Sequence, residues 1–597
     1  MSSQASGDPG APPSDAPLRE TDGQRGAMPR AWTFARAADV ALVPACVAVI
    51  ALSIGLVLTF DYGRDQAIYA LVARELVHGK MPYRDAFDFK PPGIFMVYAV
   101  ARALFGGAQF GIRVLEAISM IGTAAGLVRL AKSHLGDAKI GFVAAGLASQ
   151  VHAQLDFWHT GQPETFGGTL TILGLVLTSV GLGFGSNGLR REPPSKWLRL
   201  GAFVGAGALF GLAGLMKPPL AGGGAVVAVA AAAHVWSHRD RAAPLRATAL
   251  EAAKPIGAIA LGGALPIALV LLWFKAKGAL GDLHDVLFVF TPFYTKLSWE
   301  GRSFYPMAWF GITQWLTGYS SALLAGLVAT LIVRPKPSDR WLLLTAVALI
   351  GVHIAGVVMQ GKFFPYHWGA TFPLTALVGA VGVTRIYEGA AKRGPLWLVP
   401  TVVAFGIAAS FHAPVPNLET FTDRSKRRFD LFVKGPMNVD ARDELASVAD
   451  VDARENRAVA EWVKAHTKPS DTIFVWGFEC VIYDLADRPI ASRYIYDVPQ
   501  RATWSKVEMQ KKLMPELDAA KPAAIVVEHR DVFPDVTGDN YDSAGSLYGF
   551  RELQELLWNR YERATTIGDF DVYLRSELTS DEAPPSQPEG EEDGVAP

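Results

Sequence analysis

The chain has 597 residues, of which 50% are hydrophobic and only 19% are charged. This is too little charge for a soluble protein of that length, and no basic patch interleaved with aromatic residues suggests nucleic-acid binding. The two cysteines, Cys46 and Cys480, lie in an apolar run and in the polar carboxyl-terminal region, so neither a disulfide nor a Cys/His metal site is expected.

The amino-terminal residues are rich in Ser, Pro, Gly and Asp, and residues 1–36 are predicted to be a disordered cytoplasmic segment. They are too long and too polar for a secretory leader, so no cleaved signal peptide is expected. Arginines precede the first apolar run, Val40 to Phe60, and positive charge before a span places that end in the cytoplasm.

Charge is concentrated in residues 60–93, between this span and the next apolar stretch. The segment holds five acids and five bases: Asp61, Asp65, Glu75, Asp85, Asp88, Arg64, Arg74, Lys80, Arg84 and Lys90. Its apolar residues recur at helical spacing, so Asp65 to His78 is predicted to be an amphipathic helix along the membrane surface, ended at Gly79. Carboxylates and cations fixed at such an interface indicate chemistry on an anionic lipid head group.

The pattern Asp65, Tyr69-Ala70, Gly79 and Lys90-Pro91-Pro92 resembles the first extracytoplasmic loop of GT-C glycosyltransferases. The resemblance is to the protein O-mannosyltransferase group and the bacterial lipid A aminoarabinose transferases, which often have Asp-Glu where this chain has Asp65-Gln66. It implies an enzyme that transfers a sugar, with inversion, from a polyprenyl-phosphate donor to an extracytoplasmic acceptor. The acceptor class stays open among glycolipid, glycan and protein.

After this loop, Ile94 to Phe105 is apolar but short for a crossing, and a helix that dips into the membrane is expected. Full-length spans are predicted at 110–131, 139–157, 164–185, 199–216, 219–237, 255–275, 316–333, 341–360, 368–387 and 395–412, which with the first makes about eleven. The loops predicted to be cytoplasmic are the basic ones, as the positive-inside rule requires. We therefore expect a multi-pass inner-membrane (plasma-membrane) protein with its carboxyl-terminal region outside the cytoplasm.

The composition changes near residue 413. Helices are predicted at Asp452–His466 and Leu547–Tyr561, and strands at Thr472–Trp476, Ala523–Val527 and Phe570–Leu574. The predicted fold is thus an α-helical polytopic GT-C-like membrane domain, residues 37–412, followed by a small extracytoplasmic α/β domain, residues 413–575. The acidic, Pro-rich residues 576–597 are predicted to be disordered.

Asp65 is the candidate catalytic residue. Inverting transfer needs a base that takes the acceptor's proton, and partial desolvation raises the proton affinity of a carboxylate. A carboxylate that only favours the helix N-terminus is the alternative interpretation. Asp61 is a second candidate base, whereas Asp85 and Asp88 are expected to be loop acids.

Lys90 is the candidate phosphate ligand, because a fixed cation stabilises the charge that develops on the leaving lipid phosphate. Snorkelling at the end of a span is the alternative for Lys90. Lys217 begins a second Lys-Pro-Pro on the same predicted side, and phosphate binding is a hypothesis there too. Glu164, in a short loop with His159, is interpreted either as an acceptor contact or as a carboxylate of a helix first turn.

Aromatic residues dominate the predicted outer segment 276–315, where they form an interfacial belt or line a lipid or sugar groove, with Arg302 near the phosphate. Tyr366 and His367, next to Lys362, are further candidate phosphate or sugar contacts. No cofactor is predicted with certainty: a divalent metal stays open, but the lone His159 gives it only weak support.

Two hypotheses from other classes stay open at this point. A transporter or flippase of lipid-linked sugars would perform no chemistry, and it would be expected to carry mid-membrane charges and two related halves. A structural subunit would use the α/β domain to bind a partner, and Asp65 would then be dispensable.

Overall fold

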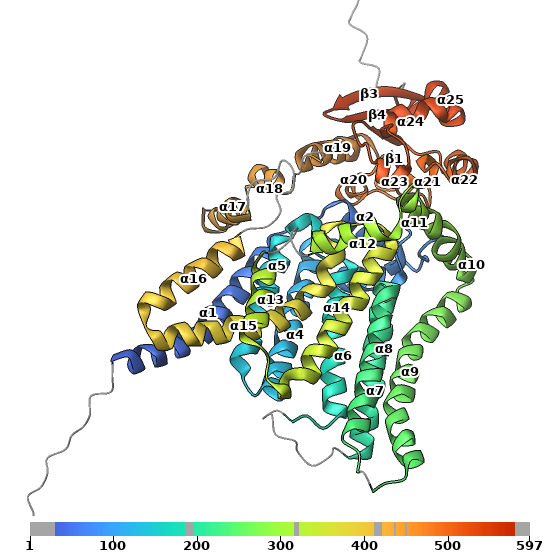
Figure 1. Ribbon diagram of the computed structural model, residues 1–597. Helices are drawn as coiled ribbons and strands as arrows, with labels where there is room; N and C mark the ends of the chain where they lie inside the picture. Colours follow the sequence, from blue (N-terminus) through green and yellow to red (C-terminus); the bar gives the residue numbers. More distant parts are fainter. Residues whose placement is uncertain are drawn as a thin grey trace, which may run out of the picture.

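The computed structural model describes residues 30–185, 195–240, 242–315, 321–410, 421–434, 438–447 and 451–579. A bundle of long helices makes up most of the molecule, and a small α/β domain caps one end of it (Figure 1). Most of the predicted disordered segments, and the predicted domain boundary at 413, lie outside the described residues. At the described edges the prediction is wrong, because residues 30–36 are helical and Ser576–Thr579 forms the short helix α26.

Eight described helices are long and apolar enough to cross a membrane. Their main helices are α1 (Arg30–Val57), α4 (Phe110–Leu130), α6 (Pro163–Gly181), α7 (Lys196–Met216), α8 (Gly222–Ser237), α9 (Leu245–Ala276), α14 (Arg340–Gln360) and α15 (Phe372–Arg393). The other predicted spans are the shorter helices α5 (Ala138–Gln154), α13 (Ser321–Val333) and α16 (Pro395–Ser410). Helix α9 exposes Leu261, Leu265 and Leu272, as a helix in contact with lipid does.

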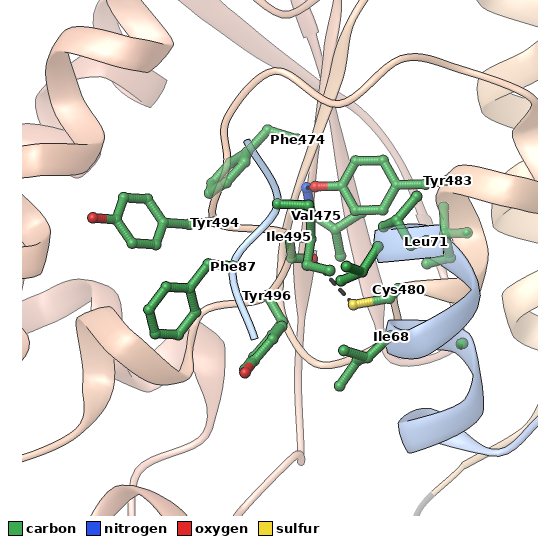
Figure 2. Close-up of a cluster of buried hydrophobic side chains, with 14 of the residues drawn as sticks. Ile68, Leu71, Phe87, Phe474, Val475, Cys480, Tyr483, Tyr494, Ile495 and Tyr496 are labelled. Carbon is green, nitrogen blue, oxygen red and sulfur yellow. Dashed lines mark hydrogen bonds between the residues drawn. The ribbon is translucent and has the colours of Figure 1, made fainter. Parts of the chain in front are cut away.

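Helices α2 (Arg64–Val77) and α3 (Pro92–Phe105) connect α1 to α4 at the end of the bundle that the α/β domain covers. The predicted amphipathic helix is present, but it is covered by the rest of the molecule rather than exposed. From Arg64 to Glu75 every residue of α2 except Asp65 is buried. The apolar face expected to meet the membrane packs on the α/β domain instead, where Ile68 and Leu71 lie beside Cys480 and Tyr496 (Figure 2). Burial of each such side chain contributes about 1.5–3 kcal/mol to holding the two parts together.

The α/β domain is built on one four-stranded sheet with the order β1-β2-β4-β3. Strands β1 (Ile473–Trp476) and β2 (Ala524–Glu528) are parallel and fully buried, as their continuous apolar sequences predict. Strand β4 (Phe570–Arg575) pairs antiparallel with β2 and with the edge strand β3 (Tyr561–Ile567). The prediction missed β3, because its exposed, polar residues lack an apolar face.

Helices cover the sheet and join it to the bundle. They are α17 (Phe421–Lys434), α18 (Val439–Leu445), α19 (Ala453–His466), α20 (Val481–Ala486), α21 (Val498–Arg501), α22 (Lys506–Ala520), α23 (Pro534–Thr537), α24 (Ser543–Ser546) and α25 (Arg551–Arg560). The predicted helix Leu547–Tyr561 was too long, since Tyr561 already starts β3. The predicted outer segment 276–315 contains α10 (Leu280–His284), α11 (Thr291–Trp299) and α12 (Phe304–Thr313), and α12 exposes Tyr305 and Trp309, as an interfacial belt requires.

Candidate functional site

The candidate site lies at the amino-terminal turn of α2, where the bundle meets the α/β domain. Gln66 fixes this turn: its Oε1 accepts the N–H of Gly63 at 3.0 Å, and its Nε2 donates to the carbonyl oxygens of Phe157, Trp158 and Thr160 at 3.2, 3.1 and 2.5 Å. A glutamate could not donate to these carbonyls. Where the resembling families often have Asp-Glu, this chain has Asp65-Gln66. It therefore lacks the second carboxylate and has in its place an amide that holds the first turn of α2.

Asp65 meets Lys90 and Gln162 on the side of α2 that faces the bundle. The Nε2 of Gln162 donates to Asp65 Oδ2 at 3.2 Å, and the Nζ of Lys90 lies 3.9 Å from the same oxygen. Tyr69, one turn after Asp65, donates its hydroxyl to Gln162 Oε1 at 3.0 Å and so orients that amide. The side chains of Asp65 and Lys90 remain 31% and 20% exposed, which leaves both accessible to a ligand.

Tyr366 joins this group from the short segment Pro365–Thr371, between α14 and α15. Its hydroxyl lies 3.3 Å from Lys90 Nζ, and its ring lies 5.4 Å beneath the same ammonium group. The ring of His367 contacts Tyr366 edge-on at 4.5 Å, while His367 Nδ1 donates to the carbonyl of Lys362 at 2.6 Å. The structure thus brings together Asp65, Lys90, Tyr366 and His367, which the sequence places almost three hundred residues apart.

Lys217 and Glu164 form a buried ion pair in the same region. Burial lowers the pKa of Lys217 from its ordinary value, opposed by Glu164, and the charges of Lys90 and Asp65 also act on it. Lys217 therefore has its charge already neutralised by a carboxylate. A donor phosphate would have to compete with Glu164 to bind it.

Arg302 stands apart from the other candidate residues. It is exposed in the loop before α12, where its backbone N–H donates to the carbonyl of Trp299 at 3.1 Å and its charge acts on Lys362. Burial lowers the pKa of Lys362 to about 8, with a further contribution from the Arg302 charge. Lys362 itself donates to the carbonyl of Asp535 in the α/β domain and lies 4.2 Å from the ring of Tyr294.

Asp61, the second candidate base, is held by a different partner. The guanidinium of Arg442 donates to both carboxylate oxygens of Asp61, with its Nε 3.0 Å from Oδ1 and 2.8 Å from Oδ2. Both side chains line a cavity of about 400 Å³ between the first loop and the α/β domain. The charge of Asp61 is therefore already compensated by Arg442.

The described residues contain no group of three or more His, Cys, Asp or Glu side chains arranged to hold a metal ion. His159 is half-buried beside Tyr366, with 5.8 Å between ring centres, and its removal from solvent lowers its pKa to about 4. Asp88 was expected to be a loop acid; it does lie in the loop, where it is buried and accepts a hydrogen bond from the Tyr496 hydroxyl at 2.9 Å.

The partners of Arg64 were not predicted. This residue precedes Asp65 and forms buried ion pairs with Glu479 and Glu528 of the α/β domain. The available signal was its position, since a cation in the first turn of a helix opposes the helix dipole and needs a compensating partner.

Comparisons with known proteins agree with this architecture. A family model described as dolichyl-phosphate-mannose-protein mannosyltransferase matches residues 89–253. The apo structure of ArnT from Cupriavidus metallidurans matches with a TM-score of 0.51 and 15% identity, over 91% of this chain and 99% of that one. The same protein bound to undecaprenyl phosphate matches at 0.50 and 14%, over 89% and 97%. No curated protein gives a significant match by sequence.

The structural matches confirm the predicted fold: the chain is a multi-pass α-helical membrane protein of the GT-C type with a small carboxyl-terminal α/β domain. The family match bears out the predicted class of enzyme, a glycosyltransferase. The matched residues include Lys90, Glu164 and Lys217, whereas Asp65 precedes them.

Proposed function

We propose that the chain transfers a sugar from a polyprenyl-phosphate donor to an acceptor hydroxyl at the membrane face covered by the α/β domain. The observation that carries this proposal is the pairing of the Asp65 carboxylate with the Lys90 ammonium, 3.9 Å apart and both partly exposed. A base for the acceptor and a cation for the leaving phosphate are the two groups that this reaction needs. Support for the donor comes from the ArnT structure, which is described as bound to undecaprenyl phosphate.

In the proposed reaction, the donor phosphate takes the place of Asp65 beside Lys90. Asp65 then loses its counter-ion, and its affinity for a proton rises. The acceptor oxygen attacks the anomeric carbon while Asp65 Oδ2 takes the hydroxyl proton. The bond between the anomeric carbon and the phosphate oxygen breaks, and Lys90 stabilises the negative charge left on the polyprenyl phosphate. Attack opposite to the leaving group inverts the anomeric centre.

The neighbouring groups have positioning and binding roles in this proposal. Gln162, oriented by Tyr69, holds the carboxylate of Asp65 in place. The Tyr366 hydroxyl and the His367 ring offer hydrogen-bond groups to the phosphate or the sugar. Lys217 and Glu164 form a second polar group that the substrate contacts. Arg302 contacts the donor head group only if the substrate extends toward Lys362.

We further propose that this face is extracytoplasmic, that the membrane is the plasma membrane, and that the amino terminus is cytoplasmic. The alternation of basic loops supports this orientation. A reporter that is active only in the cytoplasm, fused at Ser576, should be silent. An active reporter would reverse the orientation and place the candidate site on the cytoplasmic side.

The function is tested with the purified full chain in detergent. The donor is a radiolabelled polyprenyl-phosphate sugar, and the acceptor is the envelope glycan and glycolipid fraction of a deletion strain, whose missing sugar is identified by mass spectrometry. Label is expected to move from lipid to acceptor. A flippase would restore the missing sugar in cells but would transfer no label in detergent, and that result would overturn the proposal.

A further inference from the structure

Arg64 and Asp65 are consecutive residues that serve different parts of the molecule. Neighbouring side chains on a helix point in directions about 100° apart. Asp65 therefore faces Lys90 in the bundle, whereas Arg64 faces the α/β domain, with its Nε 2.5 Å from Glu479 Oε1 and its Nη2 3.2 Å from Glu528 Oε1. All three side chains of this second group are about 95% buried, with exposures of 5%, 5% and 3%.

The two carboxylates that receive Arg64 are fixed by the sheet. Glu528 is the last residue of β2, and its Oε2 accepts the backbone N–H groups of Phe478 and Glu479, just after β1, at 2.6 and 3.2 Å. Glu479 in turn accepts a hydrogen bond from Asn456 Nδ2 at 2.7 Å. Both acids thus lie at the carboxyl ends of the parallel pair β1-β2, so the guanidinium is bound by a rigid edge of the sheet.

An arginine buried at this position destabilises the fold unless its partners compensate for the burial of its charge. A cation in a helix first turn opposes the helix dipole, and its removal from water must be compensated by well-placed partners. The ring of Phe533, 4.5 Å from the Arg64 guanidinium, completes the enclosure. The rest of α2 is already attached to the α/β domain by apolar contacts, so attachment alone does not require the ion pairs.

We propose that Arg64 is a positioning residue, and that the clamp formed by Arg64, Glu479 and Glu528 fixes the first turn of α2 so that Asp65 stays aligned with Lys90. The α/β domain then takes part in the reaction without touching the reacting atoms. The effect on turnover rests on the proposed function, whereas the restraint of the first turn does not.

Arg74 provides a matched control on the same helix. It is buried, and it also bridges to the α/β domain, with its Nη1 3.1 Å from Asp484 Oδ1 and its Nε 3.1 Å from Glu75 Oε1. Arg74→Met therefore removes a comparable ion pair across the same junction. It does so near the far end of α2, away from Asp65.

The kinetic test compares Arg64→Met, Arg64→Lys and Arg74→Met in the transfer assay. Arg64→Met is expected to lower kcat about ten- to a hundredfold, because small misplacements of a catalytic group have effects of this size, with the donor KM little changed. Arg64→Lys should recover part of the loss, since it keeps the charge but not the forked geometry. Equal losses of kcat in Arg64→Met and Arg74→Met would overturn the proposal, as would full activity of Arg64→Met.

Hydrogen exchange tests the restraint without any turnover, so it separates failure of the clamp from failure of the proposed function. In the full chain in detergent, the amides of residues 67–71 should exchange faster in Arg64→Met than in wild type. Their exchange rates in Arg74→Met should equal those of wild type. Unchanged exchange in Arg64→Met would overturn the clamp. If that variant does not fold, Glu528→Gln, which leaves the Arg64–Glu479 pair intact, should give a smaller increase in the same amides, and no increase would contradict the clamp.

Discussion

Two Lys-Pro-Pro tripeptides lie at the same end of the bundle, and they differ in what surrounds the lysine. Lys90 precedes α3, is 20% exposed, and keeps a loose 3.9 Å contact with Asp65. Lys217 links α7 to α8, is 14% exposed, and is bound closely by the nearly buried Glu164. The same tripeptide therefore places one lysine just before α3 and the other just after α7. In each case the paired carboxylate determines whether the lysine charge is available to a ligand.

This difference distinguishes two roles that the sequence alone did not tell apart: binding of the donor phosphate and stabilisation of the fold. A cation with a loose partner can exchange that partner for a phosphate at small cost. A buried cation with a close partner is held because an unpaired carboxylate left behind would be strongly unfavourable. We accordingly assign Lys90 to the donor phosphate and expect the main contribution of Lys217 to be to stability.

The largest expected effect is therefore on stability, at Lys217. Lys217→Met should lower the free energy of unfolding by about 3–5 kcal/mol, because it leaves Glu164 buried without a partner. The double variant Lys217→Met/Glu164→Gln removes both charges and should recover most of this loss. Thermal unfolding in detergent measures both values. A stable but inactive double variant would instead assign Lys217 to the phosphate and remove the difference between the two lysines.

A second difference lies two residues before each lysine, where Lys90 has the buried acid Asp88 and Lys217 has Leu215. Burial raises the pKa of Asp88 to about 6, so the folded protein holds a proton there that the unfolded chain releases near pH 4. Stability should therefore fall as pH rises from about 4 to 6 and stay lower above that range. The contribution of this group is about 3 kcal/mol.

Asp88→Asn tests this assignment, because it should remove that part of the pH dependence of unfolding. Tyr496→Phe is the matched control: it deletes the hydrogen bond that favours the charged form of Asp88, so the pH dependence should grow. An unchanged pH profile in Asp88→Asn would show that another group is responsible.

The smallest of these effects, in free energy, concerns Lys90 and is seen in activity. Lys90→Ala should lower transfer about ten- to a hundredfold, equal to about 1.5–3 kcal/mol for a charge-assisted contact, with expression and insertion unchanged. Lys90→Met keeps the apolar stem and removes only the charge, so it should be equally impaired. Full activity of Lys90→Met would indicate a snorkelling lysine and make the two tripeptides equivalent.

The sequence predicted the features that depend on local pattern. In the described part of the chain, every predicted span contains a helix, because lipid demands long apolar segments whose backbone bonds are satisfied internally. Strands β1 and β2 followed from short buried apolar runs. Asp65 and Lys90 were found together because one short loop carries both, and a family pattern marks that loop.

What the sequence did not predict depends on contacts between distant segments. Helix α2 has the apolar periodicity of an exposed amphipathic helix, but a domain far along the chain packs on Ile68 and Leu71 and pairs with Arg64. The partners of Arg64 lie 415 and 464 residues away, and no local spacing encodes them. The availability of Lys90 and the neutralisation of Lys217 were likewise decided by neighbours that only folding brings together.

The central claim, that Asp65 is the base, is tested most directly by Asp65→Asn in the detergent transfer assay. The amide keeps the size and the hydrogen bond with Gln162 but cannot take a proton, so transfer should fall about a hundred- to ten-thousandfold while binding of the lipid donor persists. A purely structural Asp65 would contribute only a favourable charge in the helix first turn, worth about 0.3–1 kcal/mol, so it predicts little change. Full transfer by the Asn variant would contradict the account and move the search for the base to Asp61.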